Sequence, residues 1–363
     1  MSRPGVADKS SANQSAVLQN APDQAAWARL GAYLFAQGVT PHAQITATLL
    51  AGGQSNPTYR LNSGDQAFVL RKKPAGDLLP SAHAVDREYR VMKALQDTAV
   101  PVPEMLVYCD DDSLIGTPFY VMPFLQGRVF FDQTLPDMTR EQRGQVYADM
   151  NRALAQLHCI DPRAVGLGDY GKAGNYFGRQ TRRWSQQYQQ NHTERIESLE
   201  RLIDWLPDRI PAGDLTTIVH GDYRLDNVML HANEPRVIAV LDWELSTLGH
   251  PLADFSYHCM SWHIPPTLWR GIGGLDLASL GIPSESDYIK QYVAVTCYEG
   301  VQEHWNFYLA YNFFRIAAIL YGVGERAKQG NAAADNALEM ATKAAPLADI
   351  GWHYAQKYQA QRG

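Results

Sequence analysis

Cysteine is scarce in this sequence, and the few cysteines that it has lie far apart. Among 363 residues there are four, Cys109, Cys159, Cys259 and Cys297, with no C-x-x-C pair and no histidine-paired spacing. This pattern excludes a disulfide framework and a cysteine-based zinc site. We therefore expect reduced thiols in a cytoplasmic protein.

Long apolar runs and a surplus of positive charge are also lacking. No stretch approaches the roughly 18 apolar residues of a membrane span, and the N-terminus has no apolar segment typical of a secretory signal. The 32 Lys and Arg residues are outnumbered by 38 Asp and Glu residues, for a net charge of −6. The sequence thus predicts no membrane partner and no nucleic-acid partner. Residues 1–22, rich in Ser, Ala, Asn and Gln, are predicted to form a disordered tail.

The two common glycine motifs for phosphates are absent as well. The turn "AGGQSN" (51–56) lacks a full G-x-G-x-x-G, and no G-K-[ST] follows it. Two glycines between strands are often a plain hairpin. In this position, however, the turn can lay backbone N–H groups and a hydroxyl over phosphates. We predict nucleotide binding by Gly52, Gly53, Ser55 and Asn56.

What the sequence does contain is a set of short predicted strands followed by a set of predicted helices. Short apolar runs predict strands at 45–50, 58–62, 67–71, 104–110 and 118–125, with a helix beginning after residue 23 and another at 82–97. Further helices are predicted near 139–159, 176–192, 193–206, 252–262, 285–299, 302–329 and 333–358. These elements predict an α+β protein with a small N-terminal lobe (23–126) and a mainly helical C-terminal lobe (127–363).

The stretch "HGDYRLDN" carries the strongest chemical pattern. His220 precedes Asp222 by two residues, and Asn227 follows that aspartate by five. This is the spacing of the kinase catalytic loop H-R-D-x-x-x-x-N, in which the aspartate accepts the proton of the attacking hydroxyl. Asn and Asp oxygens are also the ligands that Mg²⁺ prefers. The pattern predicts Asp222 as catalytic base and Asn227 as a metal ligand, with His220 bracing the loop.

A second acid follows the next apolar run. "VIAVLD" (237–242) delivers Asp242 from the end of a buried strand. An aspartate in such a place is usually a turn residue. Twenty residues after Asp222, it instead favours a second magnesium ligand.

The segment "FVLR" (68–71) predicts a nucleotide-binding strand. Strand alternation places Val69 and Arg71 on one face, as in the V-A-I-K strand of kinases. Arg71 then stands in the lysine's place, with Lys72 and Lys73 as alternatives. Glu88, on the predicted helix, is positioned to pair with the cation; a surface arginine and a solvated glutamate are the alternative.

The sequence leaves the roles of three further features open. Asp254 either caps the following helix or is a buried acid that holds the backbone of the catalytic loop. Arg179 and Arg183 share a helix face and either bind an anion or face solvent. Arg315 lies in an apolar helix and calls for an anionic partner.

Together these segments resemble the aminoglycoside phosphotransferase family of small-molecule kinases. The matching stretches run in the family's order over about residues 45–260: "GGQSNPTYRL", "FVLRKKP", "REYRV", "FYVMPFLQGR", "HGDYRLDNVML" and "LDWELSTLGHPLADF". The resemblance implies a two-lobed protein-kinase-like fold, with ATP and magnesium as cofactors. It also implies an adenine-binding hinge at 122–125, which includes Met122 and Phe124.

Two further stretches, "GLGDYGKAGNYFGRQTRRWSQQY" and "FYLAYNFFRIAAILYGVGERAKQGNA", resemble a subgroup associated with acyl-CoA dehydrogenases. That resemblance implies an ATP- and Mg-dependent phosphotransferase that acts on the hydroxyl of a small molecule, a hydroxyacyl-CoA. It also implies an acyl-CoA dehydrogenase as functional partner. The alternatives are an aminoglycoside or amino-alcohol kinase and a nucleotide-binding pseudokinase with a regulatory role.

Overall fold

The computed structural model describes residues 21–50, 56–75, 83–190, 194–328 and 336–362. Gly52, Gly53 and Ser55 of the predicted phosphate turn lie outside these ranges, as do residues 1–20 of the predicted tail. The chain divides into two compact units. Unit 1 comprises Met1–Asp97 and Val102–Gln126, and unit 2 comprises Thr98–Pro101 and Gly127–Gly363.

Unit 1 is built on a five-stranded antiparallel sheet with the strand order β1-β2-β3-β5-β4. The strands are β1 (Thr46–Leu49), β2 (Thr58–Ser63), β3 (Gln66–Lys72), β4 (Val107–Cys109) and β5 (Phe119–Pro123); the helices are α2 (Gln24–Ala36), α3 (Val85–Leu95) and the short α4 (Asp112–Ile115). The loop "DDSLIG" between β4 and β5 contains α4 because Asp111 caps its first turn and Gly116 ends it in the left-handed region.

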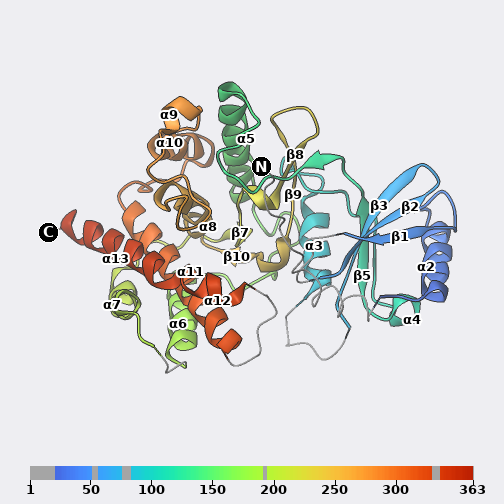
Figure 1. The fold of residues 1–363 in the computed structure, drawn as a ribbon, viewed down its shortest axis with the longest axis horizontal. Helices are drawn as coiled ribbons and strands as arrows, with labels where there is room; N and C mark the ends of the chain where they lie inside the picture. The colour runs from blue at the N-terminus through green and yellow to red at the C-terminus, as the bar shows by residue number, and fades with distance from the viewer. Residues whose placement is uncertain (1–20, 51–55, 76–82, 191–193, 329–335, 363) are drawn as a thin grey trace, which may run out of the picture. The chain divides into compact units, whose positions relative to one another are not determined.

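The alternation along β3 separates the two faces of this sheet. Phe68 and Leu70 pack in a core with Leu30 and Leu34 of α2. The opposite face carries the side chains that face α3, so the sheet lies between the two helices (Figure 1). The predicted strands and their parity are therefore present, with shorter bounds for the first strand and the last two.

Unit 2 is mainly helical. Its helices are α5 (Arg140–His158), α6 (Tyr176–Gln189), α7 (Glu197–Trp205), α8 (Pro251–Cys259), α9 (Leu277–Leu280), α10 (Glu285–Thr296), α11 (Trp305–Lys328), α12 (Ala337–Ala341) and α13 (Ala344–Ala360). Short 3-10 helices lie at Leu206–Arg209, Leu225–Asn227, Trp243–Leu245 and Met260–His263. The single helix predicted for 333–358 is thus two helices in the described part, and α9 escaped prediction because it is only one turn long.

Two small antiparallel sheets in unit 2 position the polar loops. One pairs β7 (Thr217–Val219) with β10 (Thr247–Gly249); the other has the order β6 (Gly127–Arg128), β8 (Val228–His231), β9 (Val237–Val240). The backbone of Pro101 belongs here too, because its carbonyl accepts a hydrogen bond from Val240 N at 2.8 Å. β6 and β10 were not predicted, since two or three residues give no periodic pattern.

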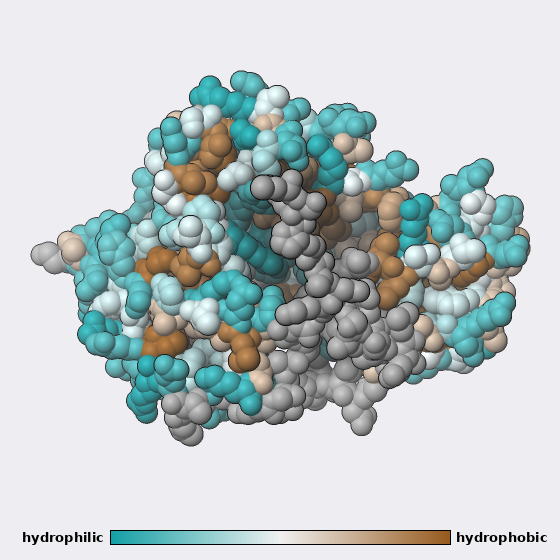
Figure 2. All heavy atoms as spheres, in the orientation of Figure 1, coloured by the Kyte–Doolittle hydropathy of each residue, from teal (hydrophilic) through white to brown (hydrophobic). Residues whose placement is uncertain are grey.

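Helix α11 is the central apolar element of unit 2. In the described residues it is the one helix whose length and hydropathy would allow a membrane span, although the sequence was expected to contain none. Of its most apolar window, 83% is buried. Burial of this kind is typical of a core helix. The surface that Figure 2 shows over the surrounding helices is mainly hydrophilic, with small apolar patches.

Candidate active site

The loop between β7 and β8 carries the predicted catalytic residues and depends on one glycine. Gly221 has φ +84°, and a Cβ atom there would lie 2.6 Å from the carbonyl oxygen of Leu245. A side chain at this position would meet both a strained backbone and a collision. Gly221 therefore lets the loop between His220 and Asp222 turn tightly over the segment that follows Asp242.

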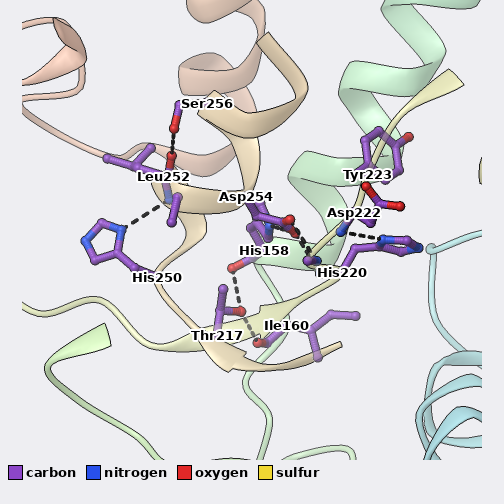
Figure 3. Close-up of polar contacts among 12 residues, drawn as sticks. His158, Ile160, Thr217, His220, Asp222, Tyr223, His250, Leu252, Asp254 and Ser256 are labelled. Carbon is purple, nitrogen blue, oxygen red and sulfur yellow. Dashed lines mark hydrogen bonds and ion pairs between the residues drawn. The ribbon is translucent and has the colours of Figure 1, made fainter. Parts of the chain in front are cut away.

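Asp254 holds the backbone of this loop. Of the two roles that the sequence left open, a helix cap or a buried acid that holds the loop, the second is therefore correct. Its Oδ2 accepts from the backbone N–H of His220 at 2.6 Å, and its Oδ1 accepts from that of Gly221 at 2.9 Å. His158, at the end of α5, lies 3.2 Å from Oδ2. Burial acts to raise the pKa of Asp254, but the hydrogen bonds and charges of His158 and His220 outweigh it and lower that pKa. Figure 3 shows the carboxylate between the two histidines, and the cap of α8 is His250 instead.

His220 is fully buried and braces the loop as expected. Its Nε2 lies 2.8 Å from the carbonyl oxygen of Leu241, and its Nδ1 accepts from the backbone N–H of Asp222 at 3.2 Å. The ring therefore joins the residue before Asp242 to the candidate base.

Three donors hold the carboxylate of Asp222, which remains 18% exposed. Tyr257, on α8, donates its hydroxyl to Oδ1 at 2.5 Å. Oδ2 accepts from Asn227 Nδ2 at 3.0 Å and from Arg224 Nε at 3.2 Å. The side chain is thus oriented through both oxygens. Oδ2 already accepts from two donors, whereas Oδ1 accepts from one of those named here and has a second lone pair for a further donor.

Asn227 and Asp242 lie at the same end of the β8–β9 ribbon. Val228 pairs with Val240, and Leu241 N donates to the carbonyl oxygen of Asn227 at 2.8 Å. The backbone at Asp242 has φ +63°, a left-handed conformation that costs on the order of 1 kcal/mol and is common at functional sites. No property of the sequence pattern had indicated that conformation.

The donor atoms of these two residues fit magnesium. Asn227 directs Nδ2 to the carbonyl and carboxylate of Asp222, so its oxygen is the atom left for a hard cation. Among the described residues, no three His, Cys, Asp or Glu side chains form a metal cage. Two oxygen ligands suit Mg²⁺, which usually keeps water and phosphate oxygens in the rest of its shell.

Arg224 and Asp226 take part in the site through a chain of ion pairs. Arg224 Nε lies 3.2 Å from Asp222 Oδ2 and 3.3 Å from Asp226 Oδ1, and Arg270 Nη1 lies 2.5 Å from Asp226 Oδ2. Burial, together with the charges of Asp222 and Asp242, raises the pKa of Asp226 against the effect of Arg224. The sequence could have indicated Arg224 through its position between two acids; Arg270, 44 residues after Asp226, gave no signal.

In unit 1, Glu88 is the centre of a buried polar network. Its carboxylate lies 2.8 Å from Arg71 Nε and accepts from Asn56 Nδ2 at 2.8 Å and from the Tyr120 hydroxyl at 2.9 Å. Glu88 is 1% exposed. The predicted Arg71–Glu88 pair is therefore formed. Asn56, also predicted to bind nucleotide, uses its side chain in this network and toward His83.

Val69, Met122 and Phe124, the other predicted nucleotide residues that the structure describes, lie on the same face of the sheet. Val69 pairs with Met122 across β3 and β5. Phe124 follows β5, with the guanidinium of Arg60 4.5 Å from its ring centre. Lys72 points to the opposite side, where its Nζ donates to the carbonyl oxygen of Ile115 and burial lowers its pKa. Arg71 is therefore better placed than Lys72 for a role beside Val69.

Of the three arginines left open by the sequence, Arg179 and Arg315 have backbone partners, and the guanidinium of Arg183 lies 5.0 Å from the centre of the Trp184 ring. Arg179 donates to the carbonyl oxygens of Lys172 and Ala173. Arg315 donates to the carbonyl oxygen of Gly221 at 2.9 Å, and its guanidinium lies 5.2 Å from the centre of the Tyr257 ring. The anionic partner expected for Arg315 is thus replaced by a carbonyl oxygen and an aromatic face.

The chain is similar to a known protein family and to several known proteins. Residues 46–276 match the phosphotransferase enzyme family (APH). Acyl-CoA dehydrogenase family member 10 of Mus musculus is 44% identical over 307 residues, which covers 84% of this chain and 29% of the mouse protein. The chain thus spans less than a third of that relative's length.

Two solved structures add to this. A protein of Ralstonia eutropha JMP134, classed provisionally as an aminoglycoside phosphotransferase, has a TM-score of 0.84 and 50% identity over 93% of this chain and 99% of its own. Aminoglycoside phosphotransferase APH(4)-Ia, solved with ADP and hygromycin B, has a TM-score of 0.57 and 14% identity, covering 89% of this chain and 97% of that one. The second likeness concerns the fold alone.

The fold and the loop chemistry are those of a kinase-like phosphotransferase. The predicted α+β, protein-kinase-like fold class is thereby confirmed. The chain belongs to the phosphotransferase enzyme family, as its resemblance to the aminoglycoside phosphotransferases implied.

Proposed function

We propose that this protein transfers the terminal phosphoryl group of ATP to a hydroxyl group of a hydroxyacyl-CoA. The observation that carries the chemistry is Asp222, whose carboxylate is oriented through both oxygens and still partly exposed. A carboxylate held in this way can orient an attacking hydroxyl and receive its proton. Asn227 and Asp242 are proposed to hold Mg²⁺, which would neutralise negative charge on the phosphates.

Unit 1 is proposed to bind the nucleotide. Arg71, fixed by Glu88, would contact the phosphates, while Val69 and Met122 offer an apolar surface for the adenine ring. Contact between the phosphates and the backbone N–H groups of residues 51–56 stays a prediction. Catalysis would come mainly from positioning and electrostatics, as in other phosphoryl transfers.

The acceptor is proposed from the relatives. The mouse protein that shares 44% identity with this chain is named for acyl-CoA chemistry, and this chain aligns with a part of it. An acyl-CoA dehydrogenase is accordingly the functional partner that we propose. An aminoglycoside acceptor is the alternative, favoured by the name of the structural relative with 50% identity. A pseudokinase would need neither Asp222 nor a complete metal pair.

An acceptor screen tests the proposal. Purified protein is incubated with Mg-ATP and hydroxyacyl-CoAs of several chain lengths, aminoglycosides, or amino alcohols, and products are identified by mass. We expect the mass of one phosphoryl group to be added to a hydroxyacyl-CoA. Transfer to aminoglycosides alone would replace the proposed acceptor, and nucleotide binding without any transfer would support the pseudokinase.

The variant Asp222→Asn tests the base. We expect turnover to fall by roughly 10²- to 10⁴-fold, the usual contribution of a general base, while ATP binding measured by calorimetry changes little. The exposed Asp208→Asn serves as the matched control. Wild-type turnover in Asp222→Asn would remove Asp222 from the mechanism.

A further inference from the structure

A pocket in unit 2 adjoins the candidate base. It is lined by Gln133, Arg224, Tyr257, His258, Met260, Ser261, Ile264, Trp269 and Arg270. Two of these residues, Arg224 and Tyr257, hydrogen bond directly to the carboxylate of Asp222. A molecule in this pocket would therefore lie beside the group proposed to receive the hydroxyl proton.

The wall that carries Trp269 and Arg270 is held in place by backbone contacts. Ile272 N donates to the carbonyl oxygen of Ser261 at 2.8 Å, and Gly273 N donates to that of Ile264 at 2.9 Å. Gly271 allows the close approach, because a Cβ atom there would lie 1.8 Å from the Ile264 oxygen. This loop therefore presents its side chains in a fixed geometry.

The carboxylate oxygens beside the pocket already have hydrogen-bond partners. Tyr257 and Arg224 occupy the two oxygens of Asp222, and Arg224 and Arg270 occupy those of Asp226. A ligand rich in amino groups would compete with these donors for the carboxylate oxygens, and it would also meet two guanidinium charges. The arrangement therefore disfavours a polycationic acceptor.

The pocket offers donors instead. Within the described part of the chain, Arg224 reaches the carboxylates through Nε and Arg270 reaches Asp226 through Nη1. A guanidinium has five N–H donors in a planar fork, so both side chains retain N–H groups for a ligand. Met260 and Ile264 are buried and supply an apolar floor, with Trp269 beside them.

We propose that this pocket is the acceptor site, and that Arg224 and Arg270 select a hydroxylated acyl compound through its carbonyl or carboxylate oxygens. The proposal rests on the phosphotransferase function proposed above and specifies its acceptor. The acyl chain lies against Met260, Ile264 and Trp269, and the hydroxyl reaches Asp222, where a second lone pair accepts its proton.

The variant Arg270→Gln tests this assignment, because Arg270 is 41% exposed and its replacement leaves the buried residues in place. Binding of a short-chain hydroxyacyl-CoA is measured by equilibrium dialysis without nucleotide, and KM and kcat are measured with Mg-ATP. We expect affinity to fall roughly 10- to 100-fold, as for the loss of a hydrogen bond to a charged group, with a matching rise in KM. Binding of free CoA, which lacks the acyl group, is expected to stay the same.

Arg236→Gln is the matched control. Arg236 is also half exposed and lies 2.5 Å from an acid, Glu234, yet it does not line the pocket. It should leave binding and KM unchanged. Arg270→Lys should give an intermediate loss, because it keeps the charge without the planar fork. Thermal unfolding of each variant checks that the fold is retained.

The possible outcomes distinguish a wrong pocket assignment from a wrong proposed function. If wild-type protein phosphorylates hydroxyacyl-CoA but Arg270→Gln and Arg236→Gln behave alike, the pocket assignment is wrong and the function stands. If binding depends on Arg270 but no phosphoryl transfer occurs, the pocket stands and the proposed function is wrong. Kanamycin binding to the wild-type protein that weakens in Arg270→Gln would place a polycation in this pocket and overturn the choice of acceptor.

Discussion

At the residue scale, the carboxylate of Asp222 accepts hydrogen bonds from side chains of two different segments. Asn227 and Arg224 belong to its own loop, whereas Tyr257 reaches it from α8, and Arg315 of α11 lies against the Tyr257 ring. The loop thus places the carboxylate near the correct position, and the helices determine its orientation.

The variant Tyr257→Phe isolates the contribution of α8. It removes the donor to Oδ1 and preserves the ring that packs on Arg315. A hydrogen bond to a charged group is worth about 1.5–3 kcal/mol, so we expect kcat to fall about tenfold or more while KM for ATP stays unchanged. Tyr321→Phe, which removes a hydroxyl bonded to the carbonyl oxygen of Glu194, is the control. Equal kcat values in the two variants would show that Tyr257 does not position the base.

At the element scale, Asp254 joins α8 to the end of β7 and to α5. Both of its oxygens accept backbone N–H groups of the catalytic loop. Asparagine has the same shape but one acceptor oxygen, so Asp254→Asn would turn an NH₂ group toward an N–H group. We expect a loss of roughly 3–5 kcal/mol in the free energy of unfolding, as for other broken buried charge pairs, measured by urea denaturation.

Asp276→Asn provides the comparison for this measurement. Asp276 caps α9 by accepting from Ser279 N, and asparagine caps helices as well as aspartate does. A loss below about 1 kcal/mol in Asp254→Asn, the range of that cap, would mean that the loop is held by other contacts.

The pair of β3 and α3 gives a corresponding prediction in unit 1. Glu88→Gln removes the charge opposite Arg71 while retaining a side chain of the same size. We expect ATP affinity, measured by calorimetry, to fall at least tenfold, because Arg71 would no longer be held in one orientation. Glu339→Gln breaks an exposed pair with Lys343 instead and should have no effect. Unchanged ATP affinity in Glu88→Gln would separate this network from nucleotide binding.

Much of this arrangement could be predicted where it depends on spacing along the chain. The intervals between His220, Asp222 and Asn227 indicated the loop, and strand parity placed Arg71 beside Val69 opposite the core. Contacts between distant segments could not be predicted, since no local pattern records them. Tyr257 and Arg270 approach the loop only through the packing of α8 and the segment after it.

At the scale of the whole molecule, buried histidines link stability to pH. Burial lowers the pKa of His250 and of His258 from 6.5 to about 4 in each case. The unfolded chain therefore binds more protons than the folded one between pH 6.5 and about 4. Stability should fall as the pH drops through this window, by up to about 1.4 kcal/mol per pH unit for each histidine.

His258→Gln tests this expectation. The variant cannot take up the proton, and its amide can still contact the Tyr288 hydroxyl that His258 Nε2 meets at 2.8 Å. We expect the slope of unfolding free energy against pH to become shallower between pH 6.5 and 4. The exposed His353→Gln should retain the full slope. An identical slope in both variants would assign the acid sensitivity to other groups.

The carbonyl of Pro101 has a practical consequence for dividing this chain. Residues 98–101 lie within unit 2, although the chain returns to unit 1 for residues 102–126 before unit 2 continues. A fragment that begins at Gly127 would leave the N–H of Val240 without its acceptor, two residues before Asp242. Chimeras that exchange the catalytic half with that of a relative must therefore transfer two separate pieces of sequence, and the smaller piece is only four residues long.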